Sequence, residues 1–443
     1  MLSLLLIWFG LGLLLVLLVG RGPNGVLALS YFAALSVMHV PGLLAYMGPS
    51  PYPVFEEETR TGFELTLVGM AAFVGAVAVG RLLRRAPKRE KPISSPVGID
   101  RFDRLSKRFL LLGVGSYFVI MPAVAFIPSA TSIVFSFGSL LLSALWLRFY
   151  VISQQRSTRR LMTTLMMLPL LPLSTLVTGG FLGFGTIWLV TVLAFLFSIA
   201  RRRTWFILGA APAIYLGLSL FVTYMHERSE LRAFIWSDTG LIARAETAAN
   251  LITKFTLLDL SKEAHQEALA GRLNQNFLIG LIMQRHENGY FELYRGGTVP
   301  LWALVPRAVW PDKPPVGGSG TLAADTSGLH FAAGTSVGIG QVAEFYINFG
   351  REGVVLGFFV WGLVLSRFDA IIRQAFARLD AKMFIAGTLP GLSLVQPLSS
   401  LLEILVSFVA ALITVRLLRY FGLLDVTIVS RRPMAAPRRH PVA

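Results

Sequence analysis

Polar side chains that could do chemistry gather in one part of the second half of this sequence. Arg272, Asn274, Gln275 and Asn276 place a cation and three amides within little more than one helical turn. In a continuous helix, Arg272, Gln275 and Asn276 share a face at i, i+3 and i+4, and His286 returns to roughly that face. Such a face suits a sugar or phosphate ligand. An ordinary polar face of an external helix has the same composition.

A second polar group follows within a proline-rich stretch, in which Arg307, Trp310 and Lys313 lie close together. The prolines favour an extended, rigid backbone. Arginine binds phosphate oxygens with a planar fork, and lysine binds them as a point charge. The group therefore suits an anionic ligand. It equally suits a loop that touches lipid headgroups, where tryptophan is common.

The third group is Glu344, Tyr346 and Asn348, just before an apolar run. Glu344 and Asn348 share a helix face at i, i+4. A carboxylate at the lipid boundary suits a general base, because desolvation favours its protonated form. It equally suits a helix cap or an ion pair with an arginine. Glu403, inside a later apolar run, is either a functional group or the buried partner of an arginine.

Several other chemistries have no support in the sequence. The chain has no cysteine, so disulfides and thiolate metal sites are excluded. It contains no HExxH motif and no G-x-S-x-G elbow. The Gly-rich stretch 317–320 is not followed by the GK[ST] of a phosphate loop. The sequence therefore predicts no cofactor and no metal, although Glu56, Glu57 and Glu58 keep a metal-dependent glycosyltransferase open as an alternative.

The elements that position these groups are membrane-spanning helices. Hydrophobic residues make up 54% of the chain and charged residues only 14%, whereas a soluble protein carries about 25% charge. The apolar residues form runs of roughly 18 to 22, which is what a helix needs to cross a bilayer. About eleven such runs are present, at 2–20, 26–46, 63–80, 109–126, 132–150, 161–178, 180–199, 205–224, 353–368, 383–398 and 400–418.

The positions of lysine and arginine predict the orientation. The connector 81–108 holds ten of them, and with eleven helices every other basic connector falls on the same, cytoplasmic side. The N-terminus is then outside and the C-terminus inside. This distribution also accounts for the net charge of +16, so nucleic acid is not an expected partner.

The same count divides the chain into four parts. Residues 1–224 hold eight helices, 225–352 form one large external loop, 353–420 hold three more helices, and 421–443 are a basic cytoplasmic tail. Within the loop, 241–259 and 266–285 have helical spacing, 298–310 are apolar enough for the membrane surface, and 311–340 are irregular. Pro390 and Pro397 predict a broken or re-entrant tenth helix.

The order RLNQN, then PRAVWPDKP, then a Gly-rich stretch, then GQVAEFYINFG before a helix resembles the Wzy-type polymerases of bacterial O-antigen and exopolysaccharide repeat units. The resemblance is sharp over about 270–352. It implies an all-α polytopic protein of the bacterial inner membrane. The architecture is that of the O-antigen ligases and polymerases, which is similar to that of the glycosyltransferases with many membrane helices. The large loop is then periplasmic.

The resemblance also implies a reaction and a division of roles. A glycan on undecaprenyl diphosphate is transferred whole to a lipid-linked repeat unit, without metal. Arg272, Arg307 and Lys313 suit the leaving diphosphate, and Glu344 or His286 suits the acceptor's proton. Asn274, Gln275, Trp310, Tyr346 and Asn348 are the expected substrate-binding residues. The partners implied are the undecaprenyl-diphosphate-linked oligosaccharide, membrane lipids and a Wzz-type regulator of chain length.

Three alternatives stay open beside the polymerase, of which a lipid-phosphate-sugar-dependent glycosyltransferase is the one that Glu56, Glu57 and Glu58 support. An O-antigen ligase shares the architecture and the chemistry but transfers the glycan to a lipid core. A polysaccharide transporter or flippase is the non-enzyme alternative. Paired short helices interrupted by glycine or proline in both halves would favour it, and in this sequence only the run 383–398 has that character.

Overall fold

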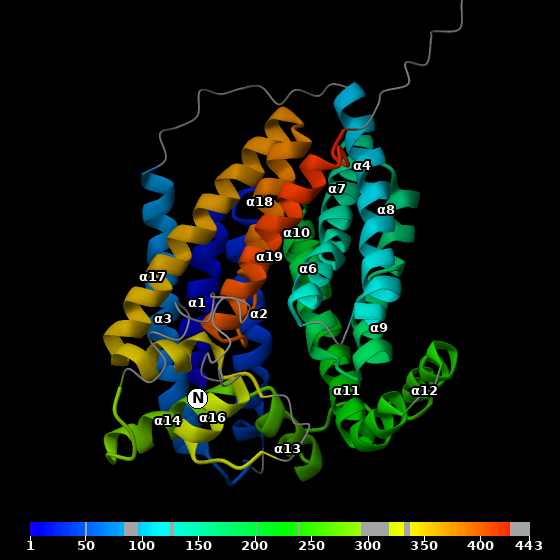
Figure 1. Cartoon of the computed structure of the whole chain (residues 1–443). Helices are drawn as coiled ribbons and strands as arrows, with labels where there is room; N and C mark the ends of the chain where they lie inside the picture. The colour runs from blue at the N-terminus through cyan, green and yellow to red at the C-terminus, as the bar shows by residue number, and fades with distance from the viewer. Residues whose placement is uncertain are drawn as a thin grey trace, which may run out of the picture.

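A computed structural model of the chain describes residues 1–48, 51–83, 96–124, 128–200, 202–237, 240–293, 319–331 and 337–425. These residues form helices and no strands (Figure 1). Nine of the helical segments they form are long and apolar enough to cross a membrane. The expected all-α class and multi-pass membrane character are therefore confirmed.

The helices follow the predicted apolar runs closely. The first part of the chain forms α1 (Leu2–Val19), α2 (Val26–His39) with the 3₁₀ turn η1 (Pro41–Tyr46), α3 (Glu56–Leu82), α4 (Pro96–Gly115) with the π-helical turn η2 (Ser116–Ile120) and α5 (Met121–Val124), α6 (Pro128–Gly138), α7 (Leu140–Gln155), α8 (Thr158–Met166), α9 (Leu170–Gly179), α10 (Gly183–Ile199) and α11 (Arg203–Trp236). The second part forms α12 (Leu241–Thr253), α13 (Glu263–Arg272), α14 (Gln275–Glu287), α16 (Ser319–Ser327), α17 (Gly340–Arg378), α18 (Ala381–Ser393) and α19 (Leu401–Tyr420).

Two of the eleven predicted runs form shorter helices. The helix α10 has 17 residues and is apolar throughout. The helix α18 has only 13 residues and contains Pro390, and the chain then bends through 394–400, where Pro397 lies, before α19 begins. The predicted break in the tenth run is therefore present, and it brings the start of α19 back toward the start of α17.

The helices outside the main bundle gather at one end of the molecule. Figure 1 shows α12, α13, α14 and α16 at the same end as the N-terminus, whereas α4 begins and α19 ends at the opposite end. We call these the loop end and the basic end. The basic end takes its name from the connectors that the sequence assigns to the cytoplasm.

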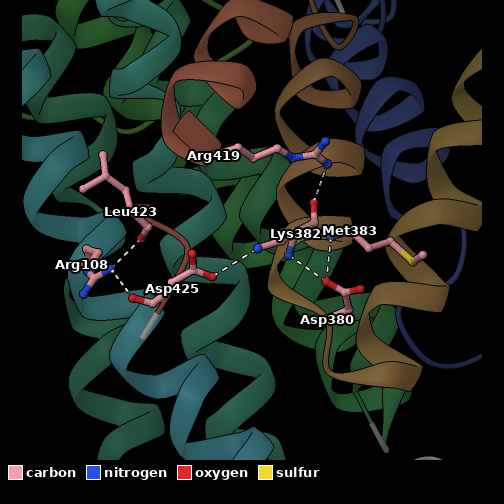
Figure 2. A network of polar contacts seen from close by, with 7 residues as sticks. All are labelled: Arg108, Asp380, Lys382, Met383, Arg419, Leu423 and Asp425. Atoms are coloured by element: carbon pink, nitrogen blue, oxygen red, sulfur yellow. Dashed lines mark hydrogen bonds and ion pairs between the residues drawn. The ribbon is translucent and has the colours of Figure 1, made fainter. Parts of the chain in front are cut away.

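A polar network at the basic end ties three segments together (Figure 2). Arg108 on α4 donates to the carbonyl oxygens of Leu423 and Asp425, at 2.7 and 3.2 Å. Lys382, in the first turn of α18, forms an ion pair of 3.3 Å with the carboxylate of Asp425. Asp380 caps α18 by accepting from the backbone N–H groups of Lys382 and Met383. The chain after α19 is thereby held between α4 and α18.

The helix α3 is central to the packing and contacts both α14 and α17. Two glycines permit the contact with α14. A Cβ atom at Gly62 would lie 2.0 Å from the carbonyl oxygen of Asn276, and one at Gly280 would lie 1.9 Å from that of Glu58. The two backbones therefore touch without intervening side chains, which fixes α14 of the loop against a membrane-spanning helix.

A second long-range contact joins α2 to α17 near the basic end. The carboxylate of Asp369 is buried and accepts from the backbone N–H groups of Leu27 and Ala28, at 2.9 and 3.2 Å. These N–H groups belong to the first turn of α2, which has no cap from its own N-cap residue, Gly25. An aspartate 342 positions away in sequence from Leu27 therefore caps this helix.

The connection between the two groups of spanning helices differs from the expected loop. The helix α11 continues to Trp236 and α17 already begins at Gly340, so the connection is 237–339. The predicted helix 241–259 ends at Thr253. The stretch 311–340, expected to be irregular throughout, contains the helix α16. The predicted surface segment 298–310 and most of the tail 421–443 lie outside the described residues.

Candidate functional site

The first predicted group does not form one helix face. The helix α13 ends at Arg272 and α14 begins at Gln275, with Leu273 and Asn274 in non-helical conformations between them. The expectation that Arg272, Gln275 and Asn276 share a face was therefore wrong. The break also removes the helical continuity that would have returned His286 to the side of Arg272.

The amides after the break fasten α14 to the membrane helices. The side-chain amide of Asn274 donates to Thr59 on α3 at 2.9 Å. Gln275 donates to the carbonyl oxygens of Gly338 and Ile339, at 2.8 and 3.0 Å, just before α17 begins. Both residues were expected to bind substrate, but these bonds position the start of α14 against α3 and α17.

Asn276 forms a reciprocal pair with His39 at the end of α2. Its amide donates to the carbonyl oxygen of His39 at 2.8 Å, and its Oδ1 lies 2.6 Å from Nδ1 of the same residue. Both side chains are buried, and Thr66 on α3 also approaches Oδ1, at 3.5 Å. The pair satisfies a polar interior position where α2, α3 and α14 meet.

Glu344 lies on α17 and caps α19. Its side chain is 5% exposed, and its Oε2 accepts from the backbone N–H of Leu401 at 2.6 Å. The same helix end also carries a capping box between Ser400 and Glu403, and Ser319 of α16 donates to Glu403 at 3.0 Å. Of the roles that the sequence left open for Glu344, the helix cap is therefore the one that the geometry displays. Glu403 has the same capping function and no arginine partner among these contacts.

His286 and Tyr346 meet where α14 lies beside α17. The imidazole Nδ1 is 3.1 Å from the Tyr346 hydroxyl, and the two rings stand edge to face. His286 is half-buried and Tyr346 is buried. Asn348 is buried one turn beyond Glu344, where its amide donates to the Glu344 carbonyl at 2.8 Å. We call Asn274, Asn276, Glu344, Tyr346 and Asn348 the polar seam: all five are buried, the first two at the start of α14 against α3 and α2, and the last three on α17.

Arg272, the last residue of α13, lies near two arginines of α11. It interacts electrostatically with Arg228 and Arg232, which lie one turn apart near the end of that helix. The pKa of Arg272 is lowered from its ordinary value. Partial desolvation by neighbouring protein is the larger cause, although the residue still reaches the surface, and repulsion by the charge of Arg232 is the second. We call Arg228, Arg232 and Arg272 the arginine cluster.

Neighbouring groups hold the arginine cluster in position. Arg228 interacts with Tyr224, whose hydroxyl donates to the Gly180 carbonyl oxygen at 2.8 Å. Arg232 donates to the carbonyl oxygen of Gly180 at 3.2 Å and lies 4.3 Å above the ring of Phe181. Within the described residues, Arg272 forms no ion pair with a carboxylate. Three neighbouring guanidinium groups of like charge, of which Arg232 is held by Gly180 and Phe181, form a site suited to a polyvalent anion.

Sequence reasoning missed Arg228 and Arg232 because they follow the eighth apolar run and lie outside the motif region. Two signals were nevertheless available. The positive-inside rule gives no reason for arginines at a helix end that the sequence assigns to the outside, and the spacing i, i+4 puts both on one helix face. Arg307, Trp310 and Lys313, the remaining predicted residues, lie outside the described residues.

The predicted site thus divides into two places. His286 is twelve residues after Asn274, or about 18 Å along α14 at 1.5 Å per residue. Arg272 and His286 therefore stand at opposite ends of α14. A diphosphate is much shorter than this separation, so one reacting centre does not contact both.

Acidic residues offer little for a metal ion in the part of the chain that the structure describes. No group of three or more histidine, aspartate or glutamate side chains there has the arrangement of a metal site. Glu56, Glu57 and Glu58 occupy the first turn of α3, where Glu56 and Glu57 are exposed and Glu58 is half-buried. Negative side chains at a helix N-terminus interact favourably with the helix dipole, which gives this acidic run a structural role.

Comparison with known proteins returned no relatives. No family model matches this chain, no curated protein matches it, and no solved structure matches it.

Proposed function

We propose that this protein is a metal-independent glycosyltransferase of the bacterial inner membrane, with its N-terminus outside and its C-terminus inside. In this proposal it transfers a growing glycan from undecaprenyl diphosphate to a lipid-linked repeat unit at the periplasmic face. The arginine cluster is the observation that carries the proposal, together with the motif resemblance over 270–352.

The arginine cluster matches the demand of that reaction. A hydroxyl oxygen of the acceptor sugar attacks the anomeric carbon, the bond from that carbon to the diphosphate oxygen breaks, and the hydroxyl proton passes to water. Negative charge accumulates on the diphosphate as the bond breaks. Cations that are already in place stabilise this charge without reorganising. Arg228, Arg232 and Arg272 supply three of them on elements held by packing and hydrogen bonds.

The position of the cluster also suits a lipid-linked substrate. The helix α11 is a candidate membrane span over Phe206–Ile235 and has many exposed apolar side chains, among them Ile207, Leu208, Ile214 and Leu216. Arg228 and Arg232 lie toward its loop end. A diphosphate bound there would hold its undecaprenyl chain beside a lipid-facing helix.

The proposal assigns no general base to the polar seam. Glu344 already accepts from the first N–H of α19, and His286 lies at the far end of α14. Diphosphate is a good leaving group, so transfer depends mainly on stabilising its charge. The seam then has the task of fixing α14, and with it the Leu273–Asn274 connection that leads back to Arg272.

The decisive experiment uses the purified full-length protein in lipid vesicles with undecaprenyl-diphosphate-linked repeat units as the only substrate. We expect a ladder of lengthening glycans with no nucleotide sugar present, and the same ladder in EDTA. No product in EDTA would favour the metal-dependent alternative. Transfer to an added lipid core without a ladder would favour the ligase. If folded wild-type protein forms no product, the proposal is contradicted.

A further inference from the structure

The segment 254–258, which we call the strap, follows α12 and lies along α11 without forming a helix. Its path is set by contacts at successive turns of α11. Lys254 forms an ion pair with Glu227, the N–H of Thr256 donates to the Thr223 hydroxyl at 3.1 Å, and the N–H of Leu258 donates to the Ser219 hydroxyl at 2.9 Å. The strap therefore runs from the loop end of α11 toward the middle of that helix.

Hydroxyl groups of α11 bond to the backbone of the strap at Thr256 and Leu258. Ser219 and Thr223 each accept from a strap N–H while donating to a carbonyl oxygen four residues back in α11, at 2.8 and 2.9 Å. The hydroxyl of Tyr215, one turn earlier, donates to the Leu258 carbonyl oxygen at 2.9 Å. Non-helical backbone at membrane depth needs protein partners of this kind, because lipid offers none.

The register of α11 gives the depth of the strap. Arg203 begins the helix and donates to the carbonyl oxygen of Gly20, directly after α1, so it marks the basic end. Ser219 is then about 24 Å along the axis and Glu227 about 36 Å, at 1.5 Å per residue. A hydrocarbon layer is about 30 Å thick. The ion pair of Lys254 with Glu227 falls outside that layer, and Leu258 falls within its outer edge.

The side chains of the strap agree with this depth. Phe255 and Leu257 are 39% and 55% exposed, whereas Leu258 is buried against α11 and α13. Beside them on α11, Ile214 and Leu216 are 61% and 51% exposed. The exposed apolar surface of a membrane span therefore continues onto the strap, while the charged pair at its start stays on the aqueous side.

We propose that the strap is inserted into the outer edge of the bilayer, with Leu257 in contact with lipid acyl chains and Phe255 at the boundary of the hydrocarbon layer. The connection between α11 and α17 is then anchored in the membrane at this point. The chain turns back through Asp259 and Ser261 into α13, whose last residue is Arg272. Insertion of the strap would thus set the height of α13 relative to the lipid surface. The proposal does not depend on the glycosyltransferase activity.

The test uses single cysteines, since the chain has none of its own. Leu257→Cys is compared with Leu216→Cys on the lipid-facing side of α11 and with Ala264→Cys at an exposed position of α13. Sheared membranes, open on both sides, are treated with a charged thiol reagent that does not enter lipid. We expect Leu257→Cys to label as slowly as Leu216→Cys, at least tenfold more slowly than Ala264→Cys, and all three to label fully after denaturation in detergent.

A second measurement checks the result independently. A nitroxide attached at residue 257 should collide more with oxygen, which concentrates in lipid, than with a water-soluble nickel complex. Labelling of Leu257→Cys at the rate of Ala264→Cys would overturn the proposal, as would preferential collision with nickel. Open membranes make the outcome independent of which face is periplasmic. Fast labelling of Leu257→Cys would therefore show that the strap lies in water, whichever side of the membrane it occupies.

Discussion

The polar seam and the arginine cluster differ in burial and in charge. In the seam, amides and a carboxylate are buried and bonded to neighbouring helices, as Asn276 is to His39. In the cluster, three guanidinium groups of one sign lie together where side chains still reach the surface. The seam lowers the energy of the fold, whereas the cluster is held together against its own repulsion. The comparison separates residues that support the site from those positioned for a ligand.

The largest effect is expected where α14 touches α3. Gly280→Ala places a Cβ atom 1.9 Å from the backbone carbonyl oxygen of Glu58, which no side-chain rotation relieves. We expect little folded protein in the membrane. Gly271→Ala is the matched control, because a Cβ atom there meets nothing within 4 Å. Abundance and thermal aggregation in detergent measure both, and equal stability of the two variants would refute the contact.

Next in size is the effect of the arginine cluster on catalysis. We expect Arg272→Ala and Arg228→Ala each to reduce the rate of glycan transfer by about 10²–10³, the usual cost of removing one donor to a developing charge. Arg272→Lys should lose nearly as much, because lysine lacks the planar fork. Chain growth by the reconstituted protein is the measurement.

Arg351→Ala is the control for these arginine changes. Its side chain is 66% exposed and forms only a surface pair with Glu287, at 3.6 Å, so its removal should leave both rate and stability nearly unchanged. Arg228 and Arg232 are unsuitable as controls, because they belong to the arginine cluster. If well-folded Arg272→Ala and Arg228→Ala variants transfer glycan at the wild-type rate, the arginine cluster has no part in the reaction.

A smaller effect should distinguish a helix cap from a general base at Glu344. Glutamine keeps an oxygen that accepts from the Leu401 N–H, so Glu344→Gln should retain stability and most activity. Glu344→Ala loses the acceptor and should destabilise the protein by about 1–2 kcal/mol. Unfolding in denaturant and the transfer rate are measured together. A stable Glu344→Gln protein with a rate reduced by about 10²–10⁴ would instead identify a base.

The smallest effect concerns the pH dependence of stability in the first turn of α13, the helix that ends at Arg272. Burial, then the neighbouring His226 and Lys262, lowers the pKa of His265 below its ordinary value of 6.5. Its Nδ1 accepts from the N–H of Asp259 at 3.0 Å, which requires an unprotonated nitrogen. The neutral ring therefore stabilises the fold fully above about pH 6.5, and this contribution is lost as pH falls toward the lower pKa of the folded state.

Hydrogen exchange in α13 measures this effect. Protection should decrease as pH falls below about 6.5, after correction for the intrinsic pH dependence of exchange, and His265→Gln should flatten the change. Protection in α14, which the seam holds, serves as the internal reference and should stay constant. An equal loss of protection in both helices would show a global change rather than one at His265.

The sequence predicted the helices far better than their ends and contacts. All eleven apolar runs correspond to helices because a run of apolar residues has few other solutions in lipid. The break at Leu273–Asn274 was missed, since neither residue is a strong helix breaker and tertiary bonds to Thr59 and Gly338 determine it. The extension of α11 to Trp236 was missed because the polar residues after 224 resemble the start of a loop.

The sequence could not predict which residues of the candidate site lie close together in space. Asn274 and Gln275 were predicted to bind substrate and Glu344 to act in catalysis, and the structure gives all three bonds to neighbouring elements. The partnership of Arg272 with Arg228 joins positions more than forty residues apart on α13 and α11. Periodicity describes one element at a time, so it carries no information about which faces of two separate elements meet.

The cap that Asp369 supplies to α2 has a consequence for biosynthesis. The helix α2 leaves the ribosome more than 300 residues before α17 exists, so the N–H groups of Leu27 and Ala28 must wait for their carboxylate until the chain is nearly complete. Nascent intermediates therefore contain an incompletely satisfied helix end, open to water or to quality-control proteases. The carboxylate of Asp369 replaces water as the partner of these N–H groups only when α17 packs against α2.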